Sequence, residues 1–300
     1  MRIPQKGIRL PILQITDIFQ MIIASLAIGS LYALLGIGLN VVYSVTRLVN
    51  IAHGDWLMLG AYLTYSLFSF YQISPIISLA VVGLVTGSIG GLLYKSLFSR
   101  IVHRAKSLAE VEVNSYLIFF GLLLVVENLV TLRFSSLTRG YSWGANPITY
   151  FGVSILVNRL FTAIFSAVII AALVVVMRAT WLGKAIRFAM DDRDAAKLMG
   201  VNVERIFALC CTIGFAIAGM AGNLVGMIYE VSPTMGLSYT LIAFTVIVLA
   251  GTGNFGGTLL AGLSLGFAET FGVYFTTPAL RVIIAYSILI IVVVLRRRGS

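Results

Sequence analysis

Residues 178–206, RATWLGKAIRFAMDDRDAAKLMGVNVERI, form the most polar stretch of an otherwise strongly apolar sequence. The stretch lies between apolar runs at 153–177 and 207–229, each long enough to cross a bilayer. It contains six of the 21 Lys and Arg residues and four of the 11 acidic residues. Because short loops rich in Lys and Arg lie on the cytoplasmic side of membrane proteins, the stretch predicts a cytoplasmic loop between two membrane spans.

The composition of the chain indicates a polytopic membrane protein. Hydrophobic residues make up 59% of the sequence and charged residues only 11%, whereas a soluble domain has about 25% charged residues. The net charge of +10 comes mostly from residues between and beyond the apolar runs, which fits a positive-inside topology and contact with anionic lipid headgroups. No surface of interleaved basic and aromatic residues indicates nucleic-acid binding.

The apolar runs predict an all-α polytopic membrane fold with about 8–10 transmembrane helices, including a broken or re-entrant segment. We expect a basic surface segment at 1–17, a single transmembrane domain at 18–296 that contains the polar stretch, and a basic cytoplasmic tail at 297–300. The expected spans are 18–45, 48–71, 76–98, 113–132, 153–177, 207–229, 239–250, 257–275 and 281–295. Several are rich in Gly and Ala, which allow helices in lipid to approach closely.

The number of runs conflicts with the charge of the N-terminus. Nine crossings would place the arginines that end the chain inside and the basic N-terminus outside, whereas Lys and Arg near an N-terminus favour an inside location and an even number of crossings. A broken or re-entrant segment at 37–60 or at 239–257 would reconcile the two, and we expect one of them.

The second half of the polar stretch predicts a short helix of its own. Asp191 and Asp192 can cap its N-terminus, and Asp194 and Lys197 can pair at i and i+3. Gly200 can end the helix at its C′ position.

This helix has two interpretations. It can be a charged loop that only fixes topology, or a docking helix that presents a small apolar face of Ala195, Leu198 and Met199 to a cytoplasmic partner. The sequence DAAKLMG at 194–200 looks like the Glu-Ala-Ala-x-x-x-Gly loop that permease subunits of ABC importers press into their ATPases, which favours docking. The expected ATPase-coupling residues are Arg187, Asp191, Asp194, Ala195, Lys197, Leu198, Met199 and Gly200.

Polar residues inside or next to the apolar runs are candidates for a transport path. His53 and Asp55 stand where the second run begins, with Gly54 between them. They can cap a helix, or they can belong to a broken helix whose polar groups line a cavity. This His-Gly-Asp triplet is too short to indicate a metal or catalytic site, and we expect no metal and no cofactor. The candidate path residues are Asn40, Tyr43, Asn50, His53, Asn223 and Glu269.

Three further features have competing interpretations. Glu269 lies inside an apolar run and is either a functional site or a structural residue, for example paired with Arg281. GTGNFG at 251–256 matches the dinucleotide-binding pattern G-x-G-x-x-G, but its flanks are membrane runs, so we interpret it as a Gly-rich turn between packed segments. Cys210 and Cys211 are neighbours in one apolar run, which makes a disulfide between them improbable.

Several stretches together resemble the membrane permease of branched-chain amino acid ABC importers, the LivH-type subunit. They are GSLYALLG at 29–36, VNIAHGD at 49–55 followed by MLGAY at 58–62, GKAIR at 183–187 with LMGVN at 198–202, AGMAG at 218–222 and LAGTG at 249–253. The sequence departs from the family pattern at Ala250, where the family usually has Gly, and in its tail, RRRGS at 296–300. Both departures leave the substrate open.

The resemblance implies a multi-pass permease subunit in a prokaryotic plasma (inner) membrane, importing amino acids, with branched-chain amino acids as the default. Implied partners are a second, homologous permease, two cytoplasmic ATPases and an external binding protein. The sequence has no G-x-x-x-x-G-K-[ST] P-loop, so we expect no enzyme activity in this chain and ATP hydrolysis in its partners.

Two other functions remain open. One is an ion-coupled secondary transporter or channel for small polar solutes such as urea or amides, with Glu269 or Asp55 coupling the ion. The other is an intramembrane enzyme, which is disfavoured because the sequence has no H-E-x-x-H motif, no Ser-His pair and no clustered acids.

Overall fold

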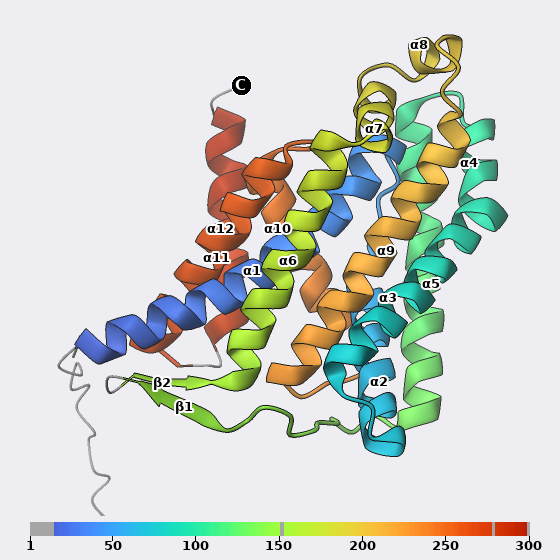
Figure 1. Cartoon of the computed structure of the whole chain (residues 1–300). Helices are drawn as coiled ribbons and strands as arrows, with labels where there is room; N and C mark the ends of the chain where they lie inside the picture. The colour runs from blue at the N-terminus through green and yellow to red at the C-terminus, as the bar shows by residue number, and fades with distance from the viewer. Residues whose placement is uncertain (1–14, 151–152, 278–279, 299–300) are drawn as a thin grey trace, which may run out of the picture.

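The structure is a computed structural model that describes residues 15–150, 153–277 and 280–298. Helices that run between two ends of the molecule make up nearly all of it (Figure 1). Among the described helices, six are long and apolar enough to cross a membrane, which confirms the all-α polytopic fold. They are α1 (Ile15–Thr46), α3 (Pro75–Leu93) with the short turns that continue it, α5 (Leu108–Phe134), α6 (Val157–Ala179), α9 (Val203–Ile228) and α11 (Phe255–Phe275).

Three more helices run in the same bundle: α2 (His53–Tyr71), α10 (Gly236–Ala250) and α12 (Arg281–Arg298). The turns that continue α3 are a π-helical segment, η1 (Tyr94–Phe98), and α4 (Ser99–Arg104). The short helices α7 (Trp181–Asp191) and α8 (Arg193–Leu198) project from one end, hereafter the α8 end (Figure 1).

The opposite end of the molecule, hereafter the hairpin end, carries a small β-hairpin. Strands β1 (Pro147–Tyr150) and β2 (Val153–Leu156) pair antiparallel, with Ile148 opposite Ile155. The predicted fifth span began at 153, but its first four residues form β2, and α6 starts four residues later. The β-branched residues of this segment also fit a strand, so the apolar run alone did not mark the boundary.

Small residues let the helix backbones touch, as the sequence predicted. A side chain on Gly266 of α11 would place its Cβ 2.3 Å from the Cα of Gly29 in α1. A side chain on Gly214 of α9 would place its Cβ 2.7 Å from the carbonyl oxygen of Gly38 in α1. Helix α1 is therefore wedged between α9 and α11, with backbone against backbone on both sides.

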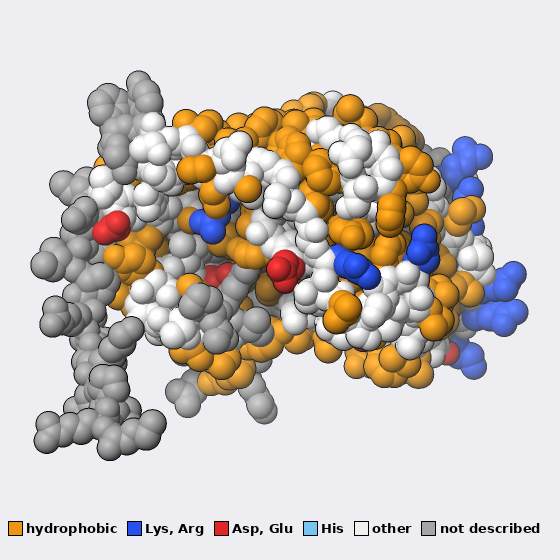
Figure 2. Space-filling model, turned by 90° about the horizontal axis from the view of Figure 1, so that it is seen from below, with side chains coloured by type: hydrophobic (Ala, Val, Ile, Leu, Met, Phe, Trp, Pro, Cys, Tyr) orange, Lys and Arg blue, Asp and Glu red, His pale blue; other side chains and the backbone are white. Residues whose placement is uncertain are grey.

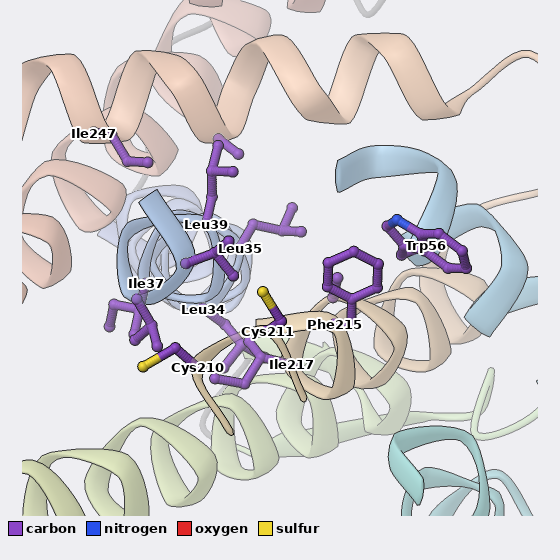
Figure 3. Packing of buried hydrophobic residues seen from close by; sticks show 14 of the residues in the cluster. Leu34, Leu35, Ile37, Leu39, Trp56, Cys210, Cys211, Phe215, Ile217 and Ile247 are labelled. Carbon is purple, nitrogen blue, oxygen red and sulfur yellow. The ribbon is translucent and has the colours of Figure 1, made fainter. Parts of the chain in front are cut away.

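Apolar side chains from α1, α2, α9 and α10 fill the space between these helices (Figure 3). Trp56 of α2 packs on Phe215 of α9 with ring centroids 4.7 Å apart. Cys210 and Cys211 are both buried in this cluster as free thiols, and their side chains point in different directions (Figure 3).

The two ends differ in charge. The hairpin end carries Arg133, Arg139 and Arg159 in or next to its loops, whereas most other described basic residues belong to the α8 end. The basic residues of the α8 end are Arg47, Lys95, Arg100, Arg104, Lys106, Arg178, Lys184, Arg187, Arg193, Lys197 and Arg205. The positive-inside rule predicts that the α8 end is cytoplasmic and that the hairpin end faces out.

The described helices bear on the conflict between the basic N-terminus and the number of apolar runs. Helix α1 starts next to strand β2 at the hairpin end, and α12 ends at the α8 end (Figure 1). Within the described residues, α1 therefore begins and α12 ends at opposite ends of the molecule, which fits the odd number of crossings that nine runs predict. Residues 1–14 of the predicted basic segment, and 299–300 of the predicted tail, lie outside the described residues.

The segment expected to be broken or re-entrant is a break at 47–52, ahead of α2. This connection is not helical, yet Leu48, Asn50 and Ala52 in it are fully buried. It does not turn back, because α2 continues to the hairpin end, where Phe68 packs on Tyr141 with ring centroids 4.9 Å apart. The other candidate, 239–257, contains α10, which runs to the α8 end and does not re-enter.

Residues 251–254 of the glycine-rich sequence form a turn between α10 and α11, as predicted, and residues 255–256 begin α11. Gly251 and Gly253 have φ values of 86° and 77°, a region that glycine occupies without steric cost. The Asn254 side chain caps α11 by accepting a hydrogen bond from the Gly257 N–H at 2.9 Å.

Candidate functional site

The polar stretch that separates α6 from α9 folds into α7 and α8 (Figure 1). Helix α7 is amphipathic: Ala185, Ile186 and Ala189 are buried, while Lys184 and Arg187 are exposed. It folds back on α6 through a tight corner. There, the Arg187 guanidinium donates a hydrogen bond to the carbonyl oxygen of Met177, near the last turn of α6.

The local signals of α8 are those that the sequence predicted. Asp192 caps the helix, since its Oδ1 accepts hydrogen bonds from the N–H groups of Asp194 and Ala195 at 2.9 and 3.0 Å. Lys197 Nζ pairs with Asp194 Oδ1 at 3.0 Å. Gly200 ends the helix with a φ of 78°, the left-handed conformation that glycine favours at C′.

One face of α8 is fixed to the rest of the protein. Ala196 is fully buried beneath it. Arg193 donates a hydrogen bond to the carbonyl oxygen of Val45, near the end of α1, at 3.0 Å, and its guanidinium lies 4.9 Å from the ring centroid of Phe207 in α9. Burial lowers the pKa of Arg193, and the neighbouring Arg47 lowers it further. Helix α8 is thus joined directly to both α1 and α9.

The other face of α8 is open. Leu198 is 89% exposed and Met199 is 75% exposed, although both are large apolar side chains. The predicted apolar face included Ala195, which is only half-exposed, and Ala196 beside it is the residue that packs inward. The exposed apolar surface of α8 is therefore the Leu198–Met199 tip.

The interior contains a second site, where the start of α2 meets the start of α10. The Gly54 N–H donates to the hydroxyl of Thr240 at 2.8 Å, and the same hydroxyl approaches the carbonyl oxygen of Ile51 at 3.0 Å. A side chain on Gly54 would place its Cβ 1.8 Å from the carbonyl oxygen of Gly236. The two helix starts are in backbone contact. We call this contact the α2–α10 junction.

The junction lies deep between the two ends of the molecule. Next to it, Trp56 packs on Phe215, which is twelve residues along α9, or about 18 Å from the start of that helix at 1.5 Å per residue. Upstream, the Val49 N–H donates to the Ser115 hydroxyl in the second turn of α5 at 3.0 Å. The connection at 47–52 therefore carries the backbone from the α8 end into the interior.

Polar atoms at the junction are buried without protein partners. Asn50 and His53 are fully buried, and the side-chain amide of Asn50 has no hydrogen-bond partner in the described chain. The prediction that His53 and Asp55 cap a helix is wrong, because the N-cap of α2 is Ala52 and no side chain caps it locally. The alternative, a broken helix that brings polar groups to membrane depth, fits this geometry.

The other predicted path residues lie at separate helix contacts. Asn40 Nδ2 donates to the Thr258 hydroxyl at 2.8 Å, while its Oδ1 accepts from the Gly253 N–H at 2.9 Å. The Tyr32 hydroxyl donates to Glu269 Oε2 at 2.6 Å. The side chain of Arg281, the other partner proposed for Glu269, lies outside the described residues.

Two more of these residues pair elsewhere. The Tyr43 hydroxyl donates to Glu112 Oε1 in α5 at 2.9 Å, and Asn223 Nδ2 donates to the carbonyl oxygen of Pro75 at the start of α3 at 3.0 Å. The structure thus brings Asn50 and His53 to one place and distributes the other four. That these six residues line a path stays a prediction.

Sequence reasoning missed Thr240 and Thr258, whose hydroxyls bridge helices far apart in the chain. A single Thr in an apolar run carries no signal of its own, because its hydroxyl ordinarily bonds to the carbonyl four residues earlier. Both residues also do so here, at 3.2 and 2.8 Å.

A family model described as "Branched-chain amino acid transport system / permease component" matches residues 21–293. The chain is 28% identical to the high-affinity branched-chain amino acid transport system permease protein LivH of Salmonella typhimurium, over 93% of this chain and 94% of that protein. It is 28% identical to BraD of Pseudomonas aeruginosa, a permease protein described in the same words, over 95% and 96%. It is 29% identical to LivM of Salmonella typhimurium, another permease protein of this system, over 78% of this chain and 60% of LivM. No solved structure matches the chain significantly.

Proposed function

The chain belongs to the family of branched-chain amino acid transport permeases, and on that premise we propose that it forms part of the translocation path of an ABC importer for branched-chain amino acids. The substrate is the one named for the LivH and BraD relatives. Because this chain also resembles LivM, we propose that its second permease is a homologous chain.

The exposed tip of α8 is the observation that carries the coupling proposal. Leu198 and Met199 extend from a helix that is otherwise capped, paired and anchored. Large exposed apolar side chains next to a fixed backbone are typical of a protein–protein contact, and methionine adapts its shape to a groove. We therefore propose that α8, with Arg187 and Asp191 of α7 beside it, docks into a cytoplasmic ATPase.

The contacts of Arg193 suggest how a movement of α8 reaches the interior. Arg193 donates a hydrogen bond to the end of α1, and its guanidinium packs on Phe207 of α9. The connection at 47–52 follows directly after α1. A displacement of α8 by the ATPase would move the end of α1 together with this connection, and so shift the α2–α10 junction. In this mechanism the buried polar groups of Asn50 and His53 become accessible when the junction opens.

The remaining candidate path residues fit the same proposal. Asn40 fixes the turn between α10 and α11, and Glu269 fixes α11 to α1 through Tyr32. The first contact involves the turn after α10, whose start belongs to the α2–α10 junction, and the second involves α1 itself. We propose that these contacts keep the helices around the path in place while α1 moves. We also propose that an external binding protein delivers the substrate at the hairpin end.

Uptake into proteoliposomes tests this function against ion-coupled transport. The chain is reconstituted with the second permease and the ATPases, and radiolabelled L-leucine is supplied on its binding protein. We expect uptake that requires ATP and that persists when ionophores collapse the proton and sodium gradients. Uptake that needs a gradient and proceeds without ATP would overturn the proposal and favour the ion-coupled alternative.

A further inference from the structure

The hairpin end carries a cavity of about 420 Å³ between the loop that follows α5, the start of α6 and the end of α9. Seen from this end, the molecule shows scattered charged side chains among hydrophobic and uncharged polar ones (Figure 2). The cavity lining includes Tyr141, Trp143, Asn158, Gly226 and Glu230. None of them belongs to α8 or to the α2–α10 junction.

The cavity is rich in hydrogen-bond acceptors. Asn158 is 7% exposed, and its Nδ2 donates to the carbonyl oxygen of Met227 at 2.8 Å, while its buried Oδ1 has no partner in the described chain. Helix α9 ends at Ile228, so the negative end of its dipole faces this region. Glu230, two residues further on, adds an exposed carboxylate. An unpaired buried acceptor, a helix C-terminus and a carboxylate together favour a bound cation.

Aromatic side chains also line the cavity, and other rings pack against them. Trp143 packs edge-on against Phe161 with centroids 5.2 Å apart, and Tyr141 packs on Phe68. The Tyr141 hydroxyl is buried without a hydrogen-bond partner, 3.5 Å from where a Cβ on Gly226 would lie. Burial raises the pKa of Tyr141, so the phenol stays protonated at neutral pH and remains a donor. Aromatic faces also attract ammonium groups.

We propose that this cavity binds a free amino acid at the outer face: its α-ammonium group contacts Asn158 Oδ1 and the Glu230 carboxylate. Its carboxylate group accepts a hydrogen bond from the Tyr141 hydroxyl, and its apolar side chain packs on Trp143. The identity of the ligand as an amino acid rests on the proposed function. The cavity is a receiving site between release from the binding protein and entry to the interior.

Trp143 provides a direct signal for this binding. The chain in nanodiscs, with the exposed Trp181→Phe change as background, is titrated with L-leucine and with 4-methylpentanoate, which keeps the carboxylate and side chain but lacks the amine. We expect leucine to shift the Trp143 emission in a saturable way and 4-methylpentanoate to leave it unchanged. Trp143→Phe is the control that assigns the signal: it leaves the buried Trp56 as the remaining tryptophan, and the leucine-dependent shift should disappear.

Glu230→Gln is the informative variant. Glu230 is exposed, so the variant is expected to fold, and losing one charge-assisted contact should raise the half-saturating leucine concentration about tenfold. Glu110→Gln, at the α8 end, is the matched control and should leave binding unchanged. Equal shifts with leucine and 4-methylpentanoate, or an unchanged leucine titration in Glu230→Gln, would overturn the proposal.

Uptake by the complete transporter separates this proposal from the proposed function. ATP-dependent leucine uptake together with a negative titration would reject the cavity as a receiving site and leave the importer function standing. Uptake that does not depend on ATP would reject the importer function, whatever the titration shows.

Discussion

Gly54→Ala is the substitution that probes the α2–α10 junction most sharply. The added Cβ would lie 1.8 Å from the carbonyl oxygen of Gly236, and 2.8 Å from both the Gly236 carbonyl carbon and the Thr240 nitrogen. All three atoms are backbone, so no side-chain rotation relieves the clash. Because carbon atoms in proteins essentially never come within 3.0 Å of such atoms, the two helix starts would have to separate by about 1.2 Å.

The free-energy cost of this separation has two parts. Inserting a methyl group into a well-packed interior costs about 1–3 kcal/mol. Moving Gly54 also stretches its 2.8 Å hydrogen bond to Thr240, and the loss of such a bond costs about 1 kcal/mol. We therefore expect Gly54→Ala to lower the free energy of unfolding by about 2–4 kcal/mol, which corresponds to a fall in Tm of roughly 5 °C or more.

The assay is thermal unfolding of the purified chain in detergent, followed by the loss of its monodisperse peak in size-exclusion chromatography. Gly121→Ala in α5 is the matched control, since a Cβ there meets nothing within 4 Å, and alanine is the better helix former. Gly121→Ala should unfold at or slightly above the wild-type temperature. If Gly54→Ala unfolds at the same temperature as Gly121→Ala, the backbone contact at the α2–α10 junction does not exist.

Three other substitutions test separate contacts. Tyr32→Phe removes a donor from buried Glu269 and should lower the free energy of unfolding by about 1–3 kcal/mol; an unchanged Tm would show that this hydrogen bond is not formed. Asn40→Leu removes the hydrogen bonds to Thr258 and to the turn after α10. Amide hydrogen exchange in residues 251–254 should therefore accelerate at least tenfold. Exchange rates equal to those of wild type would contradict these hydrogen bonds. Gly200→Ala places a side chain on a residue with a φ of 78°, at a cost of about 1 kcal/mol. This strain should fray the end of α8 and weaken ATPase retention several-fold. ATPase retention equal to that of wild type would argue against the left-handed cap.

The sequence was most informative where the signal is local. The cap at Asp192, the Asp194–Lys197 pair and the terminal Gly200 each depend on residues at most four positions apart, and all three are present. The membrane helices could be predicted equally well from the sequence, because length and apolar composition alone define them. The exposed tip at Leu198 and Met199 followed from the same short stretch.

Features that depend on distant residues were not predictable. Nothing near Thr240 indicates that its hydroxyl meets Gly54, which lies far away in the sequence. The side on which α1 begins stayed open in the sequence, because the basic residues of 1–17 and the number of apolar runs favoured opposite sides. The cavity next to Asn158 is likewise assembled from three separate segments.

We propose that α8 transmits the action of an ATPase, and a pull-down of the chain with its co-expressed ATPases is the direct test of this proposal. Wild type is compared with Leu198→Asp/Met199→Asp and with Leu137→Asp, which places the same charge on an exposed leucine of the loop between α5 and β1. We expect wild type and Leu137→Asp to retain the ATPases, and the double variant, still inserted in the membrane, to lose them. Equal retention by all three, or no ATPase with wild type, would contradict it.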